Sequence, residues 1–263
     1  MAISAVDVQS LRKRTGAGML DAKKALEEAD GDAEKAAQIL REKGLAGAVK
    51  RADRENSQGA CYVSVGESSG SIVELRCETD FVAKSEKFVA LVGEIAKAVA
   101  EKGPEAAESF ASSVDELKIT LKENIELGKV SYMKAEDGEV IDGYMHLQSG
   151  RGTVGVLVKV KDGTKEIAHD LALHVAFARP SYLKRQDVPE DVVENERQTL
   201  ITITKNEGKP EAAIDKIVTG RLDGFFKGVC LNEQAFVKDE KVKVQDVLGK
   251  AEIVEFALVV VGA

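Results

Sequence analysis

The stretch that decides the fold is SIVELRCETDFVAKSEKFVALVGEIAKAV, residues 71–99. Its first part alternates apolar and polar residues with period two, which predicts a half-buried β-strand. Its last part, from Phe88 to Val99, repeats apolar residues at helical spacing and predicts an amphipathic helix. The connection between them, ETDFVAKSE at 78–86, is polar and charged but contains a large apolar side chain, Phe81. The strand and the helix indicate an α+β fold, and Phe81 needs an explanation of its own.

The same pattern of elements occurs twice in the chain. ACYVSVG at 60–66 predicts a strand that forms a β-hairpin with the strand described above. Further on, EVIDGYMHL and GTVGVLVKV predict two more strands, and KEIAHDLALHVAFA at 165–178 predicts a helix. Alignment of Gly70 with Gly152 indicates a duplicated strand–strand–helix core with antiparallel sheets. The second copy passes from strand to helix through the short turn KDGT, so the longer connection around Phe81 is not required to make the fold.

The first residues predict a separate helical unit. Residues 1–50 are typical of a compact three-helix module, followed by a linker at 51–58. SAVD at 4–7 matches a capping box at the start of the first helix. Short glycine-containing turns separate the helices, and Asp32 is predicted to cap a third helix that extends to Gly44. Residues 45–58 are expected to form a helical tail that runs into the linker.

The rest of the chain predicts two core subdomains, at 59–138 and 139–263. In the first, SVDE at 113–116 matches a capping box and predicts the start of a helix. In the second, two proline-led stretches carry apolar seams and are separated by a tight polar turn. They predict an antiparallel helical hairpin at 189–228 that protrudes from the body.

Composition and charge exclude several classes of function. The net charge of -8 and the pI near 5.2 argue against a surface that binds the phosphate backbone of nucleic acid. The three cysteines lack metal or redox spacing and are expected to be buried, reduced thiols. No stretch resembles a signal peptide, and none approaches the roughly 20 apolar residues that span a bilayer. We therefore expect a cytoplasmic protein that binds no nucleic acid, no membrane and no metal.

No motif for catalysis or nucleotide binding stands out. GAGML at 16–20 lacks the third glycine and the preceding strand of a dinucleotide loop, and no GxxxxGK loop occurs. His169 and His174 are five residues apart, so they do not share the helix face that a zinc pair needs. An enzyme that uses His146 with Asp142 is disfavoured, because residues four apart in a strand lie about 13 Å from each other. The sequence favours a protein that works by binding, without a cofactor and without a catalytic residue.

Two interpretations of Phe81 stay open on the residues alone. The ring can fold back under the connection and cover the start of the next helix, which makes a local apolar cluster. Alternatively, it can enter a pocket of a partner protein, with Asp80 beside it to orient or repel that partner.

Three motifs carry a resemblance to a known family: VQSLRKRTGAGMLDAKKAL at 8–26, CETDFVAK at 77–84 and LHVAFARP at 173–180. In this order and spacing they resemble bacterial elongation factor Ts over essentially the whole chain. The resemblance implies a guanine nucleotide exchange factor for elongation factor Tu, the GTPase that delivers aminoacyl-tRNA to the ribosome. It also implies that the chain is no enzyme, holds no cofactor and binds no nucleotide directly.

The resemblance further implies which residues of the core contact the GTPase. Phe81, in the segment Thr79, Asp80, Phe81 and Val82, would enter between helices of the GTPase near its magnesium and nucleotide site. His146, which precedes a glycine-containing turn, would press toward the phosphate-binding loop.

The N-terminal module is also implied to bind the GTPase. It is similar to ubiquitin-associated domains, and Met19 and Leu20 match the apolar pair that docks on the GTPase domain, with Arg12 expected to join this contact. Leu20 stands where the family often has methionine and keeps an apolar contact. The alternative function is an adaptor that tethers a partner through this module without promoting nucleotide exchange.

Overall fold

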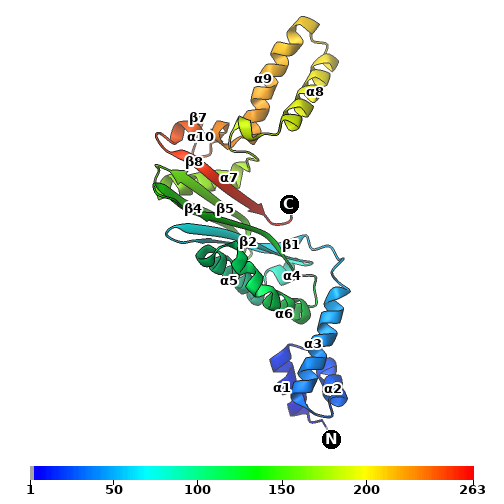
Figure 1. Ribbon diagram of the computed structural model, residues 1–263. Coiled ribbons are helices and arrows are strands. Elements are labelled where there is room, and N and C mark those ends of the chain that lie inside the picture. Colours follow the sequence, from blue (N-terminus) through cyan, green and yellow to red (C-terminus); the bar gives the residue numbers. More distant parts are fainter. Residues whose placement is uncertain (1–2) are drawn as a thin grey trace.

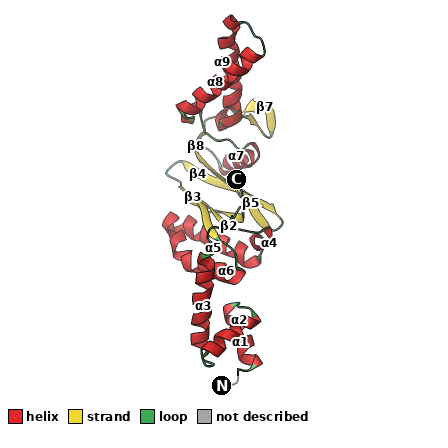
Figure 2. Cartoon of the chain, turned by 90° about the vertical axis from the view of Figure 1, so that its right-hand side faces the viewer, coloured by secondary structure: helices red, strands yellow, loops and turns green. Residues whose placement is uncertain are grey.

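The computed structural model describes residues 3–263 and shows an elongated molecule. The N-terminal helices lie at one end, a helical hairpin lies at the other, and a β-sheet covered by helices lies between them (Figure 1, Figure 2). The combination of helices with antiparallel strands confirms the predicted α+β fold class.

Three helices form the N-terminal end: α1 (Ala5–Thr15), α2 (Met19–Glu28) and α3 (Ala33–Val49). The predicted capping box is present, because the Ser4 side chain accepts from the backbone of Asp7 and the Asp7 carboxylate accepts from the backbone of Ser4. The small apolar core that joins the three helices consists of Val8, Leu11, Ala22, Ala25, Leu26, Ala29 and Ala36.

Helix α3 runs without a break through Gly44 to Val49, so the helical tail expected after Gly44 belongs to the same helix. A glycine at this position lets α3 pack closely against the body, since a Cβ there would lie only 2.5 Å from Cγ2 of Ile119. Gly44 therefore marks a close helix contact and does not end the helix.

Six strands form one sheet in the order β3-β2-β1-β5-β4, with β8 also paired to β5. All of these pairs are antiparallel. The strands are β1 (Gln58–Val65), β2 (Ser69–Cys77), β3 (Glu126–Lys134), β4 (Glu139–Gln148), β5 (Arg151–Lys161) and β8 (Glu252–Val260). The two predicted units, β1–β2 and β4–β5, thus belong to a single hydrogen-bonded sheet, and β3 is a further strand that the sequence did not indicate.

The sheet folds back on itself where the two units meet. β1 and β5 join through one residue pair, Cys61 with Gly152. The two halves then pack face to face, and a Cβ at Gly155 would lie 2.8 Å from Cγ2 of Ile72 in the other half. This inter-sheet core consists of Cys61, Ile72, Met133, Ile141, Leu157 and Val259.

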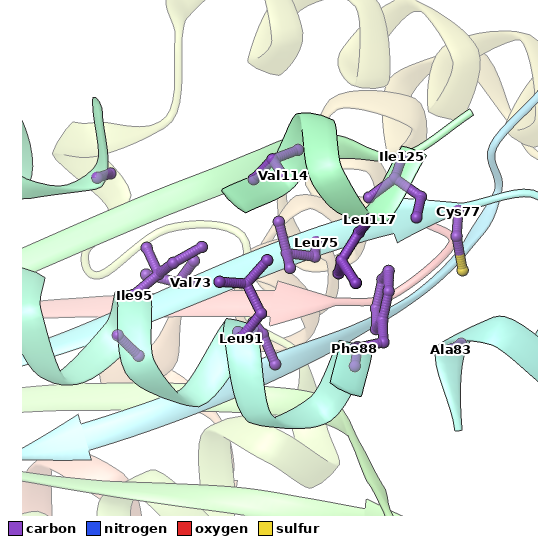
Figure 3. Packing of buried hydrophobic residues seen from close by; sticks show 14 of the residues in the cluster. Val73, Leu75, Cys77, Ala83, Phe88, Leu91, Ile95, Val114, Leu117 and Ile125 are labelled. Atoms are coloured by element: carbon purple, nitrogen blue, oxygen red, sulfur yellow. The ribbon is translucent and has the colours of Figure 1, made fainter. Parts of the chain in front are cut away.

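Helices cover the two outer faces of the folded sheet. On the first unit lie α5 (Glu86–Lys102) and α6 (Ala111–Leu121), and on the second lie α7 (Lys165–Ala178) and α10 (Val244–Val247). Figure 3 shows Phe88, Leu91 and Ile95 of α5 directed toward Val73 and Leu75 of β2. We call this cluster the α5 core.

The start of α6 corrects one prediction. The helix begins at Ala111, directly after the 3-10 helix η1 (Pro104–Phe110), and Ser113 lies inside its first turn. The predicted capping box at SVDE is therefore wrong, because the preceding 3-10 helix already leads the chain into α6 and the position before the helix, Phe110, makes no side-chain cap.

The predicted helical hairpin is formed by α8 (Glu190–Asn206) and α9 (Glu211–Val229), and it protrudes from the body (Figure 1). Its base is tied down by Arg185, which donates to Glu233 and Asp223 and lies 4.6 Å from the centroid of the Phe226 ring. The short elements beside this base are η2 (Arg185–Asp187), η3 (Leu231–Glu233), β6 (Ala235–Phe236) and β7 (Asp239–Lys243).

Candidate functional site

The connection around Phe81 is a short helix, α4 (Asp80–Ala83), and not the irregular loop that its polar sequence indicated. Thr79 caps it, because its hydroxyl accepts from the backbone N–H of Val82 at 3.3 Å. The helix turns Ala83 into the α5 core beside Phe88 and Cys77 (Figure 3). Its opposite side therefore faces outward.

The Phe81 ring lies on that outward side and is 82% exposed. The interpretation in which the ring folds back under the connection is wrong, since Ala83 and the partly buried Val82 are the members of α4 that pack on the core. Because the ring is exposed, its burial does not stabilise the free protein. A partner that covers the ring gains this favourable apolar interaction on binding.

Charged groups at both ends hold α4. The Lys84 ammonium donates to Asp80 at 2.5 Å, and this hydrogen bond holds the pKa of the Asp80 carboxyl below its usual range. At the start of the helix, the Glu123 carboxylate accepts from the backbone N–H groups of Glu78 and Thr79 at 3.0 and 3.1 Å. Sequence reasoning did not single out Glu123, because it is 44 positions away from Thr79 along the chain.

His146 lies near the end of β4 and is exposed, with its Nδ1 3.2 Å from the Tyr144 hydroxyl. A register shift lies between His146 and Leu147, and both side chains are exposed, although successive residues of a regular strand point to opposite faces. Leu147 is 60% exposed and is a second apolar side chain at this position that the sequence analysis missed.

The structure brings the turn after His146 and the end of β2 to the same end of the sheet. Arg151, just after this turn, donates to the backbone oxygen of Gly59 at 2.5 Å. Gln58, next to Gly59, pairs with Cys77 at the end of β2, two residues before the Thr79 cap. The positive charge of Arg151 also contributes to the lowered pKa of Asp80. α4 and the His146 turn therefore form one surface, which we call the α4 face.

Asp142 does not pair with His146. Its carboxylate lies 3.2 Å from Nδ1 of His169 on α7 instead. His174, the other histidine of α7, is buried, and its Nε2 lies 3.0 Å from Oε1 of Gln234. The three histidines thus lie in three different settings.

Met19 and Leu20 form the first turn of α2 and are 56% and 66% exposed. Arg12 is exposed as well and donates from Nε to the backbone oxygen of Ala17 at 3.3 Å. These residues lie apart from the α4 face, on the N-terminal helices. Asp21, next to Leu20, reaches Lys122 of the body at 3.4 Å, so this first turn of α2 lies near the segment that precedes Glu123.

The cysteines and the acidic groups form no reactive cluster in the described part of the chain. Cys61, Cys77 and Cys230 are free and buried, and burial raises the pKa of the Cys77 thiol to about 12. Within residues 3–263, no group of three or more His, Cys, Asp or Glu side chains is arranged to hold a metal ion. No helix among these residues has the length and apolar character needed to cross a membrane.

Comparison with known proteins identifies the class and then the family. A family described as "Elongation factor TS" matches residues 78–263, which places the chain among the translation elongation factors. Proteins named elongation factor Ts from Pseudarthrobacter chlorophenolicus and Clavibacter michiganensis are each 44% identical to it, and the matches cover 95% and 99% of this chain and 94% and 98% of theirs. The relative from Renibacterium salmoninarum is also 44% identical, over 99% of both chains. The chain belongs to the bacterial elongation factor Ts family.

Proposed function

We propose that the protein is a guanine nucleotide exchange factor that binds elongation factor Tu with GDP and promotes GDP release. It acts in the cytoplasm, during the elongation phase of protein synthesis, and is no enzyme in its own right. The observation that carries the proposal is the exposed Phe81 ring on a helix whose opposite side is fixed in the α5 core. A ring held out from a rigid support enters a partner pocket with little loss of conformational entropy.

The α4 face suits a partner that holds a nucleotide through magnesium and backbone N–H groups. Insertion of Phe81 near those groups displaces them, and breaking each charge-assisted hydrogen bond to the nucleotide weakens its binding by ~1.5–3 kcal/mol. Thr79, Asp80 and Val82 shape the helix that carries the ring, and His146 contacts the phosphate-binding loop from the same face. This coupling is reciprocal: if the protein lowers the affinity of elongation factor Tu for GDP, GDP lowers the affinity of elongation factor Tu for the protein to the same extent.

The first turn of α2 supplies a second interface in this proposal. Met19 and Leu20 are exposed apolar side chains, and Arg12 adds a positive charge on the same module. They increase the affinity for the GTPase, while the α4 face carries the exchange step.

The test is stopped-flow release of a fluorescent GDP analogue from elongation factor Tu. The wild-type protein accelerates release, and Phe81→Ala loses most of that acceleration, by about 30-fold or more, as expected for a buried aromatic side chain at an interface. Phe81→Ala remains folded, since the ring is exposed in the free protein. A rate equal to that of the wild type would overturn the role of Phe81.

Phe177 offers a matched control, because it is the same side chain on α7 and is 77% exposed. Phe177→Ala removes an equal exposed ring away from α4, and its effect is expected to be much smaller. Equal losses for the two variants would show that the effect reflects apolar surface in general and not insertion of Phe81.

An adaptor is the second candidate, and the exposed pair Met19 and Leu20 is the observation that favours it. The double variant Met19→Ala/Leu20→Ala separates the two. If the protein is an exchange factor, the double variant supplied at high concentration keeps residual acceleration of GDP release. If it is an adaptor that binds through the module, the double variant loses all function. In that case the wild-type protein does not accelerate GDP release either.

A further inference from the structure

The segment Lys122–Asn124 joins three parts of the molecule that are far apart in sequence. Lys122 reaches Asp21 of the N-terminal helices. The Asn124 side chain donates to the backbone oxygens of Ala52 and Arg54 at 3.0 and 2.8 Å, which fixes the segment before β1. Glu123, between them, reaches the start of α4. Its position is therefore set by neighbours on both sides.

Glu123 holds the start of α4 through several hydrogen bonds from outside that helix. Its Oε2 accepts from the N–H groups of Glu78 and Thr79, and its Oε1 accepts from the Thr79 hydroxyl. The same hydroxyl accepts from Val82 N–H and so caps the helix. The Glu78 carboxylate bonds in the opposite direction, accepting from the backbone N–H of Asn124 at 2.7 Å. These charge-assisted bonds link the two segments from both sides.

A helix as short as α4 does not persist by itself in water, because the cost of its first turn is not recovered. Its own contacts with the body are few: Ala83 is buried and Val82 is partly buried against the α5 core, while Asp80 pairs with Lys84 just beyond the helix. The half-buried Glu123 fixes the other end, where the chain leaves β2. Without this carboxylate, Thr79 keeps its hydroxyl but loses the group that orients it.

We propose that Glu123 is a positioning residue for nucleotide exchange: it orients Thr79 and α4 so that the Phe81 ring is held ready for insertion. The inference rests on the proposed function of Phe81. Glu123 does not touch the partner and acts through the helix that does.

The test is a double-mutant cycle in the full chain, measured as release of a fluorescent GDP analogue from elongation factor Tu. Glu123→Ala lowers the maximal rate of release by about tenfold, and Glu123→Gln, which keeps the size and one carbonyl acceptor, loses less. In the Phe81→Ala background the Glu123→Ala substitution changes the rate by less than about twofold, because the ring through which it acts is already absent. A residue with a merely structural role would lower the rate by the same factor in both backgrounds.

The reactivity of Cys77 provides a direct measure of whether α4 stays in place. Its Sγ lies under α4 and donates to the Thr79 backbone oxygen at 3.2 Å. Glu123→Ala therefore accelerates alkylation of Cys77 relative to Cys230, measured by peptide mass spectrometry, whereas Glu116→Ala, which removes a carboxylate on α6, changes neither the labelling nor the exchange.

The outcomes separate the two proposals. If the wild-type protein does not accelerate GDP release, the proposed function fails. If wild type and Phe81→Ala behave as described but both Glu123 variants retain the wild-type maximal rate, or if the losses in the two backgrounds are equal, the role of Glu123 is overturned. If Glu123→Ala does not fold, Glu123→Gln and the Cys77 labelling rate decide in the same way.

Discussion

The two strand–strand–helix units solve the same folding problem with different connections. In the second unit, β5 ends at Lys161 and α7 begins at Lys165, with Thr164 as its cap. In the first unit, β2 ends at Cys77 and α5 begins at Glu86, with α4 inserted between them. The short connection shows that a few residues suffice to turn a strand into its covering helix. The additional residues of the first unit support an exposed ring that the fold does not need.

Exchange of the connections tests whether the insertion serves binding. Replacement of residues 78–85 by Asp-Gly-Thr, the turn of the second unit, keeps the strand and the helix but removes α4. The chain is expected to retain its circular dichroism spectrum and to lose at least about 100-fold of its acceleration of GDP release, the scale expected when an interface anchor is removed. Asp162→Asn, in the short turn itself, serves as the control and leaves exchange unchanged. A graft that still promotes release would place the active surface elsewhere.

The two phenylalanines that follow β2 sharpen this contrast. Phe88 is fully buried in the α5 core, whereas Phe81 is 82% exposed. Phe88→Ala is expected to lower the free energy of unfolding by about 3–5 kcal/mol, because it leaves a cavity. Phe81→Ala is expected to change it by less than about 0.5 kcal/mol. Urea unfolding followed by circular dichroism measures both, and similar losses would mean that Phe81 is packed in solution.

Much of this contrast could be predicted from the sequence because its causes are local. Alternation indicated β1, β2, β4 and β5, helical spacing indicated α5 and α7, and the capping residues placed the starts of α1 and α3 correctly. The chain also showed that the connection around Phe81 is longer than its counterpart.

What could not be predicted depends on packing between distant segments. β3 was missed because its apolar residues are divided between its two faces. Val130 and Tyr132 pack, partly buried, against the α5 core, and Met133 is buried in the inter-sheet core, so no clear alternation marks the strand. α4 is too short for periodicity to reveal it, and its support by Glu123 comes from another part of the chain. Whether Phe81 or Ala83 fills the space beside Phe88 is decided by three-dimensional packing, which is why the residues alone left both interpretations open.

A buried histidine distinguishes the second unit from the first, and it makes the stability of the protein depend on pH. His174 of α7 accepts from the backbone N–H of Val237 and lies against Gln234, whereas the buried residues of α5 are apolar. Burial lowers the pKa of His174 from its ordinary 6.5, although the bond with Gln234 acts in the opposite direction.

Between the lowered pKa of the folded protein and pH 6.5, the unfolded chain therefore binds more proton at His174 than the folded protein does. The stability contributed by neutral His174 is present above pH 6.5 and is lost as the pH falls through the lower pKa of the folded state. The loss is at most about 1.4 kcal/mol per pH unit. The loss of stability is measured from unfolding midpoints at about pH 7.5 and about pH 5.5, which bracket the ordinary histidine pKa. His174→Gln is the control, because glutamine does not titrate. An equal pH dependence in the variant would assign the effect to other groups.

The smallest expected effects come from the two capping threonines, which have the same chemistry in both units. Thr164 accepts from Ile167 N–H at 3.2 Å and Thr79 accepts from Val82 N–H at 3.3 Å. Thr164→Ala is expected to lower the free energy of unfolding by about 1 kcal/mol and to leave exchange unchanged, because α7 is part of the core.

Thr79→Ala removes the same cap from the four-residue helix α4, together with the hydrogen bond from the hydroxyl to Glu123. Because α4 contributes little to the core, the substitution is expected to change global unfolding less but to slow exchange by about threefold to tenfold. Thr79→Ser, which keeps the hydroxyl, restores the rate. The two substitutions thus separate a threonine cap that stabilises the fold from one that supports nucleotide exchange. If Thr79→Ala is destabilised as much as Thr164→Ala but promotes exchange normally, α4 serves the fold and not the partner.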